Sequence, residues 1–232
     1  MFQIRKMKRI LFFYAYFFIL LSILFLTGKV QEQAAANTVT RQQERAMKFR
    51  TNPYRSHLLR NRRLVKTIER ELKSAPVPSS FFSEITYEDS FGADRKENGD
   101  YNKNVSRIHE GLDIMYTKNN SGVVPILSMT DGTIEQMGWL TLGGYRIGVR
   151  SKHDIYYYYA HLDRYQEGRH VGDQIKAGEI LGFMGDTGYG KEGTKGKFPV
   201  HLHFGIYVHG KNGQEMSLNP YPFFSHFMNG IR

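Results

Sequence analysis

Residues 153–162, HDIYYYYAHL, and residues 201–210, HLHFGIYVHG, carry the clearest signal of secondary structure in this chain. Both are rich in aromatic and β-branched side chains, which fit the pleated surface of a β-strand. Similar short runs broken by glycine occupy residues 122–138, 143–151 and 172–188. This spacing predicts an all-β domain, built as a compact antiparallel sheet of barrel or sandwich form. The pair Asp131-Gly132 predicts a hairpin turn.

The front of the chain has a different character. Residues 10–27 are an uncharged apolar run that follows a cluster of four cations, Arg5, Lys6, Lys8 and Arg9. An apolar run of this length predicts a single transmembrane helix, and the cations predict that residues 1–9 are cytoplasmic. A cleaved signal peptide is the alternative, because Ala34-Ala35-Ala36 offers small residues for cleavage. We expect an uncleaved anchor in the cell membrane, and both readings export the rest of the chain.

Residues 28–80 are predicted to form a basic helical stalk and a linker, with the globular domain at 81–232. Leu58, Val65, Ile68 and Leu72 recur near helical spacing, and Pro53 interrupts the pattern. The stalk either attracts anionic lipids and wall polymers or is a solvated spacer.

Charge is distributed unevenly along the chain. The formal net charge is +10, but residues 1–73 carry 16 Lys/Arg and 4 Asp/Glu, whereas residues 74–232 carry 16 and 18. The globular part is therefore slightly acidic and lacks a basic stripe, which argues against a nucleic-acid partner. Cysteine is absent, so neither disulfides nor thiolate ligands are available, and any metal site must use histidine and carboxylate.

Two short patterns concentrate metal-binding side chains. His109 and Asp113 stand in RIHEGLDIMY, and His201 and His203 stand in FPVHLHFGIYV. Residues two or four apart on a strand share one face, so each pair points one way. Two imidazoles and one carboxylate suit zinc and leave a fourth position for water, as in a catalytic site. His161 ends a third, Tyr-rich strand, which is expected to place its imidazole near the rim of the site.

At these residues the chain resembles the lysostaphin and LytM type of zinc endopeptidase, which hydrolyses peptidoglycan cross-links or stem peptides. The similar segments follow one order: DSFGADR (89–95), HEGLD (109–113), DGTI (131–134), YYAHL (158–162), GDQIKAGEILGFMGDTG (172–188) and HLHF (201–204). These segments are spread over about the last three fifths of the chain, and their combination in this order makes the signal specific.

The resemblance implies a role for each of five side chains. His109, Asp113 and His203 would bind Zn²⁺, and His161 and His201 would act as the catalytic pair beside it. Water activated by the metal would attack the peptide bond, so no serine or cysteine nucleophile is needed. Tyr145, in GGYRIG, is an additional candidate for substrate binding. Residues 81–232 would then be the zinc endopeptidase domain.

The expected partners are stem or cross-link peptides of peptidoglycan, together with the membrane through the N-terminal helix. The longer Gly/Lys-rich loop between Thr187 and His201 departs from the common pattern and leaves the cleaved bond open. Together with the Tyr-rich strand and the single anchor, this loop makes the chain look most like the sporulation enzymes of LytH type, which cut between L-Ala and D-Glu.

Two other classes of function compete with this reading. Residues 171–185 also resemble the hairpin of lipoyl or biotinyl carrier domains, but Asp131-Gly132 offers no lysine to modify. A catalytically inactive wall-binding or scaffold protein on the same fold is the stronger rival. Such proteins lose a metal ligand or a catalytic histidine, whereas all five are present here.

Overall fold

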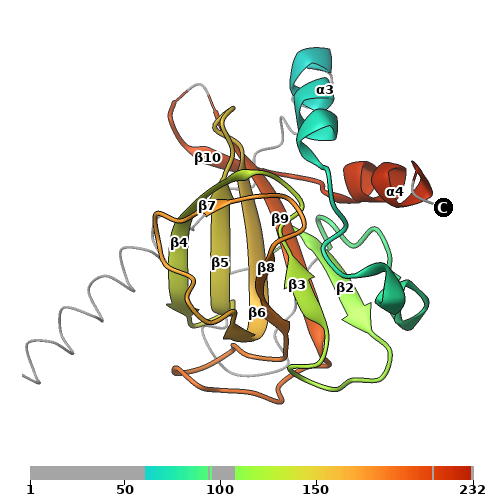
Figure 1. Ribbon diagram of the computed structural model, residues 1–232, viewed down its shortest axis with the longest axis vertical. Coiled ribbons are helices and arrows are strands. Elements are labelled where there is room, and N and C mark those ends of the chain that lie inside the picture. The colour runs from blue at the N-terminus through green and yellow to red at the C-terminus, as the bar shows by residue number, and fades with distance from the viewer. Residues whose placement is uncertain (1–60, 94, 96–107, 211, 231–232) are drawn as a thin grey trace, which may run out of the picture. The chain divides into compact units, whose positions relative to one another are not determined.

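The computed structural model describes residues 61–93, 95, 108–210 and 212–230, all of which lie in one compact unit of the chain, Phe49–Arg232 (Figure 1). The described helices are α3 (Arg62–Glu71), η1 (Ser79–Glu84) and α4 (Tyr221–Gly230). The described strands are β1 (Ile85–Tyr87), β2 (Leu112–Tyr116), β3 (Pro125–Leu127), β4 (Gly132–Leu140), β5 (Gly144–Arg150), β6 (Tyr156–Tyr165), β7 (Gln174–Ile175), β8 (Ile180–Met184), β9 (His201–His209) and β10 (Glu215–Leu218).

The strands form one antiparallel sheet, which confirms the predicted all-β class. Its main path runs β1-β2-β9-β6-β5-β4-β7, while β10 pairs with β9 and β8 joins β6 to β3. The strands β6 and β9, which contain most of the two sequence stretches quoted first, are neighbours at its centre and pair from Tyr156↔Tyr207 to Ala160↔His203.

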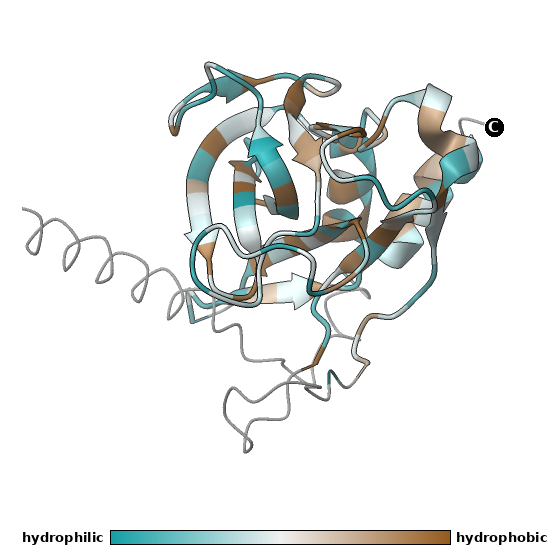
Figure 2. Ribbon diagram, turned by 90° about the horizontal axis from the view of Figure 1, so that it is seen from below, coloured by the Kyte–Doolittle hydropathy of each residue, from teal (hydrophilic) through white to brown (hydrophobic). Residues whose placement is uncertain are grey.

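Alternation along the central strands separates two faces of the sheet. On β9, Leu202, Phe204 and Ile206 are fully buried in the hydrophobic core, and on β6 Tyr157 and Tyr159 join them. The residues between them, which include His201 and His203, therefore point to the opposite face. We call this opposite side the metal face. Figure 2 shows hydrophobic and hydrophilic segments following one another along the strands, as this alternation requires.

The predicted hairpin at Asp131-Gly132 is wrong. β3 pairs with β8, and β4 pairs with β5 and β7, so no turn there joins neighbouring strands. Instead, the Asp131 carboxylate accepts hydrogen bonds from the Ala177 amide and from Lys73 Nζ. Gly132 is needed for close approach, since a Cβ there would lie 2.5 Å from the Arg150 carbonyl oxygen.

The expected transmembrane helix at 10–27 lies outside the described residues. Among the residues that are described, no helix is long and apolar enough to span a bilayer. Only the end of the predicted stalk is described, and it contains α3. Ile68 and Leu72 of this segment belong to the same hydrophobic core as the strands. The domain start at residue 81 stays a prediction, but the core itself begins before it.

Candidate metal centre and catalytic histidines

His109, Asp113 and His203 converge on one point of the metal face. Asp113 on β2 is paired directly with His203 on β9, and His109 precedes β2. His109 Nε2 lies 3.0 Å from both Asp113 Oδ1 and His203 Nδ1, and His203 Nδ1 lies 2.9 Å from Asp113 Oδ1. Three potential ligand atoms thus form a small triangle.

The chemistry of this triangle fits a zinc ion. His109 Nδ1 lies 3.1 Å from the Ser90 carbonyl oxygen, which can only accept, so Nδ1 carries the proton and Nε2 presents a lone pair. An unprotonated nitrogen and a carboxylate oxygen 3.0 Å apart repel each other unless a cation lies between them. A point about 2 Å from all three atoms exists, and that is the usual length of a zinc bond to nitrogen or oxygen.

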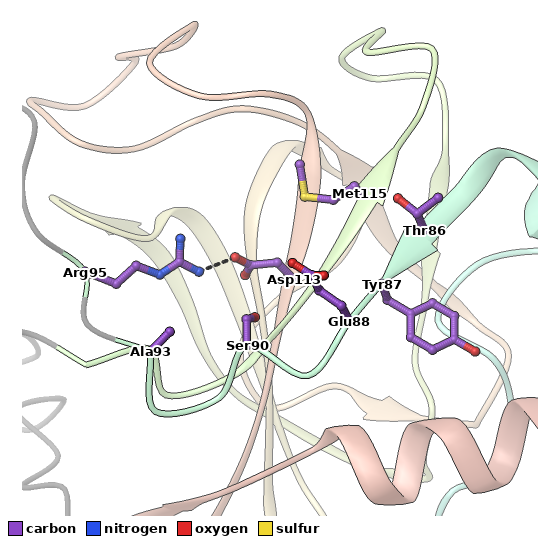
Figure 3. Close-up of a pocket in the computed structure, with 8 residues that line it drawn as sticks. All are labelled: Thr86, Tyr87, Glu88, Ser90, Ala93, Arg95, Asp113 and Met115. Atoms are coloured by element: carbon purple, nitrogen blue, oxygen red, sulfur yellow. Dashed lines mark hydrogen bonds and ion pairs between the residues drawn. The ribbon is translucent and has the colours of Figure 1, made fainter.

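Neighbouring groups hold the ligands in place. Arg95 Nη2 binds Asp113 Oδ2 (Figure 3), whereas His109 and His203 contact the other oxygen, Oδ1. The Arg95 guanidinium beside it favours the ionised form of this carboxylate. The carboxylate therefore stays ionised and available to a metal. Such outer partners fix the orientation of ligands.

Gly111 leaves the space that the His203 ring occupies. A Cβ at this position would lie 2.5 Å from both Cε1 and Nε2 of His203 and 2.7 Å from the Phe204 carbonyl oxygen. Glycine is therefore required in the HEGLD segment for the ligand to sit where it does.

His161 and His201 stand side by side next to the triangle. Their ring centroids are 4.6 Å apart, and His201 Nε2 lies 3.8 Å from Asp113 Oδ1. His161 Nδ1 donates to the Thr187 carbonyl oxygen at 2.8 Å, and His201 Nδ1 donates to that of Pro199 at 2.8 Å. Because carbonyl oxygens only accept, both rings carry their proton on Nδ1 and keep Nε2 free to accept another.

The backbone at His161 departs from a regular strand. Its φ is +61°, a left-handed value that a residue with a side chain rarely adopts. The β5–β6 register shifts here, with Ala160 and His161 on β6 facing Arg146 on β5, which makes a β-bulge. Bulges re-aim side chains, and this one turns the His161 ring toward His201 and His203.

Burial keeps the two imidazoles neutral. It lowers the pKa of His161 well below 6.5, with His201 and His203 lowering it further. It also lowers the pKa of His201, although Asp113 opposes this shift. Neutral imidazoles at pH 7 can act as proton acceptors.

Aromatic rings from the Gly/Lys-rich loop flank this pair. Phe198 lies 4.6 Å from His161 and 5.1 Å from His201 between ring centroids, and Tyr189 lies 5.1 Å from Phe198. Sequence reasoning marked this loop as unusual but named neither ring. Ser90 and Arg95 were also missed as supports, although both belong to the DSFGADR segment that carries part of the resemblance.

Tyr145 is not brought to the metal triangle by the structure. It lies on β5 next to Ile147 on the core side of the alternation, and its ring packs edge-on against Trp139 and Tyr165. Its hydroxyl lies 3.4 Å from Glu192 Oε1. A substrate-binding role for Tyr145 stays a prediction.

A pocket of about 540 Å³ adjoins the metal triangle at Asp113 (Figure 3). It lies on the β1 side of β2, and Met115 shares the face of Asp113 there. Its lining combines polar and apolar groups: Thr86, Tyr87, Glu88, Ser90, Ala93, Arg95, Asp113 and Met115.

The sequence is similar to those of an endopeptidase and of lysostaphin. The chain is 43% identical to the L-Ala–D-Glu endopeptidase of Bacillus subtilis over 117 residues. These matched residues make up 50% of this chain and 34% of that protein. The chain is also 35% identical to lysostaphin of Staphylococcus staphylolyticus over 99 residues. These matched residues make up 42% of this chain and 18% of that protein. The chain thus spans only about a third or less of the length of these relatives.

A solved structure covers more of the chain. A protein from Ruminococcus gnavus, named as a glycyl-glycine endopeptidase lytM, is 42% identical with a TM-score of 0.60 over 76% of this chain and 70% of that one. The model of peptidase family M23 matches residues 107–217, which include all three atoms of the metal triangle and both catalytic candidates. The chain therefore belongs to peptidase family M23.

Proposed function

We propose that this protein is a zinc endopeptidase that hydrolyses peptide bonds in bacterial peptidoglycan. The observation that carries the proposal is the joint arrangement of the metal triangle with His161 and His201, whose Nε2 atoms are free to accept protons. Two similar proteins that are named as endopeptidases, from Bacillus subtilis and Ruminococcus gnavus, support the substrate class.

The reaction divides between the metal and the two histidines. When bound, zinc supplies a Lewis acid that polarises a carbonyl and lowers the pKa of adjacent water. His109, Asp113 and His203 hold the ion, and Arg95 keeps the carboxylate oriented. His161 or His201 accepts a proton from the attacking water at Nε2 and later delivers it to the leaving amine.

The backbone contacts of these histidines prepare them for this task. Since Nδ1 of each ring is already committed to a carbonyl oxygen, protonation at Nε2 produces an imidazolium whose second proton keeps its acceptor. The other imidazole stays neutral with its proton on Nδ1, so its Nε2 can accept a hydrogen bond from the attacking water and help to orient it. Phe198 restricts water around both rings, which strengthens these interactions.

The bond between L-Ala and D-Glu is the proposed cleavage site. The Bacillus relative, which is named for this bond, is 43% identical, whereas lysostaphin is 35% identical. A glycyl-glycine bridge is the alternative, since the Ruminococcus structure carries that name at a comparable 42% identity. In either case the substrate lies outside the cytoplasm, and we propose that this domain is exported.

The experiment compares the purified full chain with three variants on isolated peptidoglycan. The wild type should bind about one zinc per chain and release new amino termini. His203→Ala should lose both zinc and cleavage, whereas His161→Ala should keep zinc and lose cleavage. His170→Ala, an exposed histidine, is the matched control. Mass spectrometry of the released fragments identifies the bond.

The alternative hypothesis, an inactive scaffold protein on the same fold, predicts a different result. Such a protein would bind peptidoglycan without releasing new amino termini, even when loaded with zinc. If the zinc-loaded wild type only binds, the endopeptidase proposal is wrong.

A further inference from the structure

The pocket at Asp113 extends the metal face to β1, which lies at one end of the main path of the sheet. The register of β1 and β2, in which Thr86 faces Met115, continues by one residue to place Glu88 opposite Asp113. Asp113 in turn pairs with His203. Glu88 therefore stands in one row across the sheet with two of the three metal ligands, and residues opposite one another in such a row share a face.

Glu88 carries an exposed carboxylate in the lining of this pocket (Figure 3). The other charged groups of the lining, Arg95 and Asp113, are paired with each other. The neighbouring acid Asp89 is also engaged, since it accepts hydrogen bonds from the Asn219 amide at 3.1 Å. Glu88, by contrast, makes no hydrogen bond or ion pair with any residue that the structure describes. Its negative charge is therefore available to a ligand that enters the pocket.

The rest of the lining suits a flexible chain that ends in a primary amine. An ammonium group has three donors and no acceptor. The Glu88 carboxylate and the Thr86 hydroxyl, two positions apart on one face of the chain, both offer acceptor oxygens. A hydrogen bond between charged groups is roughly twice as strong as one between neutral groups. Met115 and Ala93 add apolar surface for the methylene groups that carry such an amine. The volume of about 540 Å³ is in the range of known ligand pockets.

The pocket lies within reach of the substrate residues beside the cleaved bond. Neighbouring strands are about 4.8 Å apart, so the backbone of Glu88 lies roughly 5 Å from that of Asp113 and roughly 10 Å from that of His203. An extended peptide advances about 3.3–3.6 Å per residue. A peptide whose cleaved bond lies at the metal triangle therefore has a residue one or two positions away whose side chain can reach Glu88.

We infer that this pocket binds a free primary amine on a side chain of the peptide substrate, one or two residues from the bond that is cut, with Glu88 as its acceptor. The inference rests on the proposed function and narrows its substrate. Acylation of the amine, the change that turns such a side chain into a cross-link, removes the positive charge and two of the three donors. The pocket therefore favours peptides whose amine is free over peptides that are cross-linked through it.

The test compares two synthetic peptides, L-Ala–D-Glu–L-Lys with its side-chain amine free and the same peptide with that amine acetylated. The full zinc-loaded wild type should cut the free-amine peptide with a kcat/KM about 3- to 10-fold higher. Glu88→Gln should remove this preference and leave kcat/KM for the acetylated peptide within about twofold of the wild-type value. Glu88→Asp should retain part of the preference. Glu167→Gln, which removes an exposed acid outside the pocket, is the matched control and should change neither value.

Binding separates this inference from the proposed function. In the zinc-loaded His161→Ala variant, the free-amine peptide should bind more tightly than the acetylated one, and adding Glu88→Gln should remove the difference. If the wild type cuts neither peptide but this binding pattern holds, the proposed cleavage of this bond fails and the amine site stands. If the wild type cuts both peptides equally well, the endopeptidase proposal stands and the amine site is wrong. Equal losses on both peptides in Glu88→Gln, or no binding of either peptide, would also overturn the amine site.

Zinc content provides an independent check. Glu88 lies beside the metal triangle but is not one of its ligands, so Glu88→Gln should still bind about one zinc per chain. A clear loss of zinc in elemental analysis would mean that Glu88 supports the metal centre, and its assignment as the acceptor of a substrate amine would be wrong.

Discussion

Arg95 and Asp113 form an ion pair through Asp113 Oδ2, whereas the metal ligands His109 and His203 contact the other oxygen, Oδ1. The two oxygens of the Asp113 carboxylate therefore have different contacts. Oδ1 completes the metal triangle, and Oδ2 is held by a guanidinium that fixes the rotation of the group. Arg95 comes from the segment before β2, which explains why DSFGADR accompanies HEGLD in this fold.

Replacing Arg95 with methionine should weaken zinc binding by about 10-fold, the low end of what loss of a ligand's supporting partner costs. The reason is that the Asp113 carboxylate can then rotate away from the triangle. Competition with a zinc chelator measures the dissociation constant. Arg164→Met is the control for removing an arginine. Unchanged zinc affinity in Arg95→Met would mean that the ion pair has no positioning role.

Gly111→Ala should disrupt zinc binding without touching a ligand. The added Cβ would come within 2.7 Å of the Phe204 carbonyl oxygen and 2.5 Å of the His203 ring, so either β2 separates from β9 or the ring moves. Elemental analysis should find far less than about one zinc per chain. Gly230→Ala, where nothing lies within 4 Å of the added Cβ, should keep its zinc. Full zinc content in Gly111→Ala would contradict this account.

Local sequence patterns predicted which side chains within one segment share a face, but not the contacts between segments that are distant in the sequence. Alternation on a strand correctly put His201 and His203 on one face. That β2 pairs with β9, so that Asp113 faces His203, depends on sheet topology, which no local pattern encodes. Here the ordered segments of the family resemblance supplied what periodicity could not.

The hairpin that was predicted wrongly and the features that were not predicted have the same cause. Asp131-Gly132 has hairpin chemistry, but Asp131 is instead held by the Ala177 amide, which is distant in sequence. His161 adopts a left-handed φ without a glycine, because a bulge opposite Arg146 imposes it. The side chain of Phe198 approaches the histidines from a loop, where no periodic signal exists.

Stability of the zinc-free protein should fall as pH falls. Burial lowers the pKa of His161 and His201 in the folded state, whereas in the unfolded chain both titrate near 6.5. Below about pH 6.5 the unfolded state therefore binds more protons, so acid favours unfolding. The Tm of protein treated with EDTA should drop between about pH 7.5 and 5.5. His161→Leu, which cannot be protonated, should show a smaller drop, and an equal drop would exclude His161 as a source.

The contacts of Glu71, which lies on α3, with the β-sheet should contribute measurably to the free energy of unfolding. Its buried carboxylate accepts from the Tyr157 hydroxyl at 2.9 Å and lies 2.6 Å from His153 Nδ1. Glu71→Leu leaves the buried hydroxyl without an acceptor, which should lower the free energy of unfolding by about 1–3 kcal/mol. Urea denaturation measures this loss, and Glu69→Leu, an exposed position on the same helix, should cost far less.

A double variant separates the hydrogen bond from the packing of the helix. Adding Tyr157→Phe to Glu71→Leu removes the stranded hydroxyl, so the pair should be more stable than Glu71→Leu alone. Recovery of this kind would make α3 part of the folded domain, and a catalytic fragment would then have to begin near residue 61. If Glu71→Leu and Glu69→Leu cost the same, α3 contributes little, and a fragment that begins at residue 81 should fold equally well.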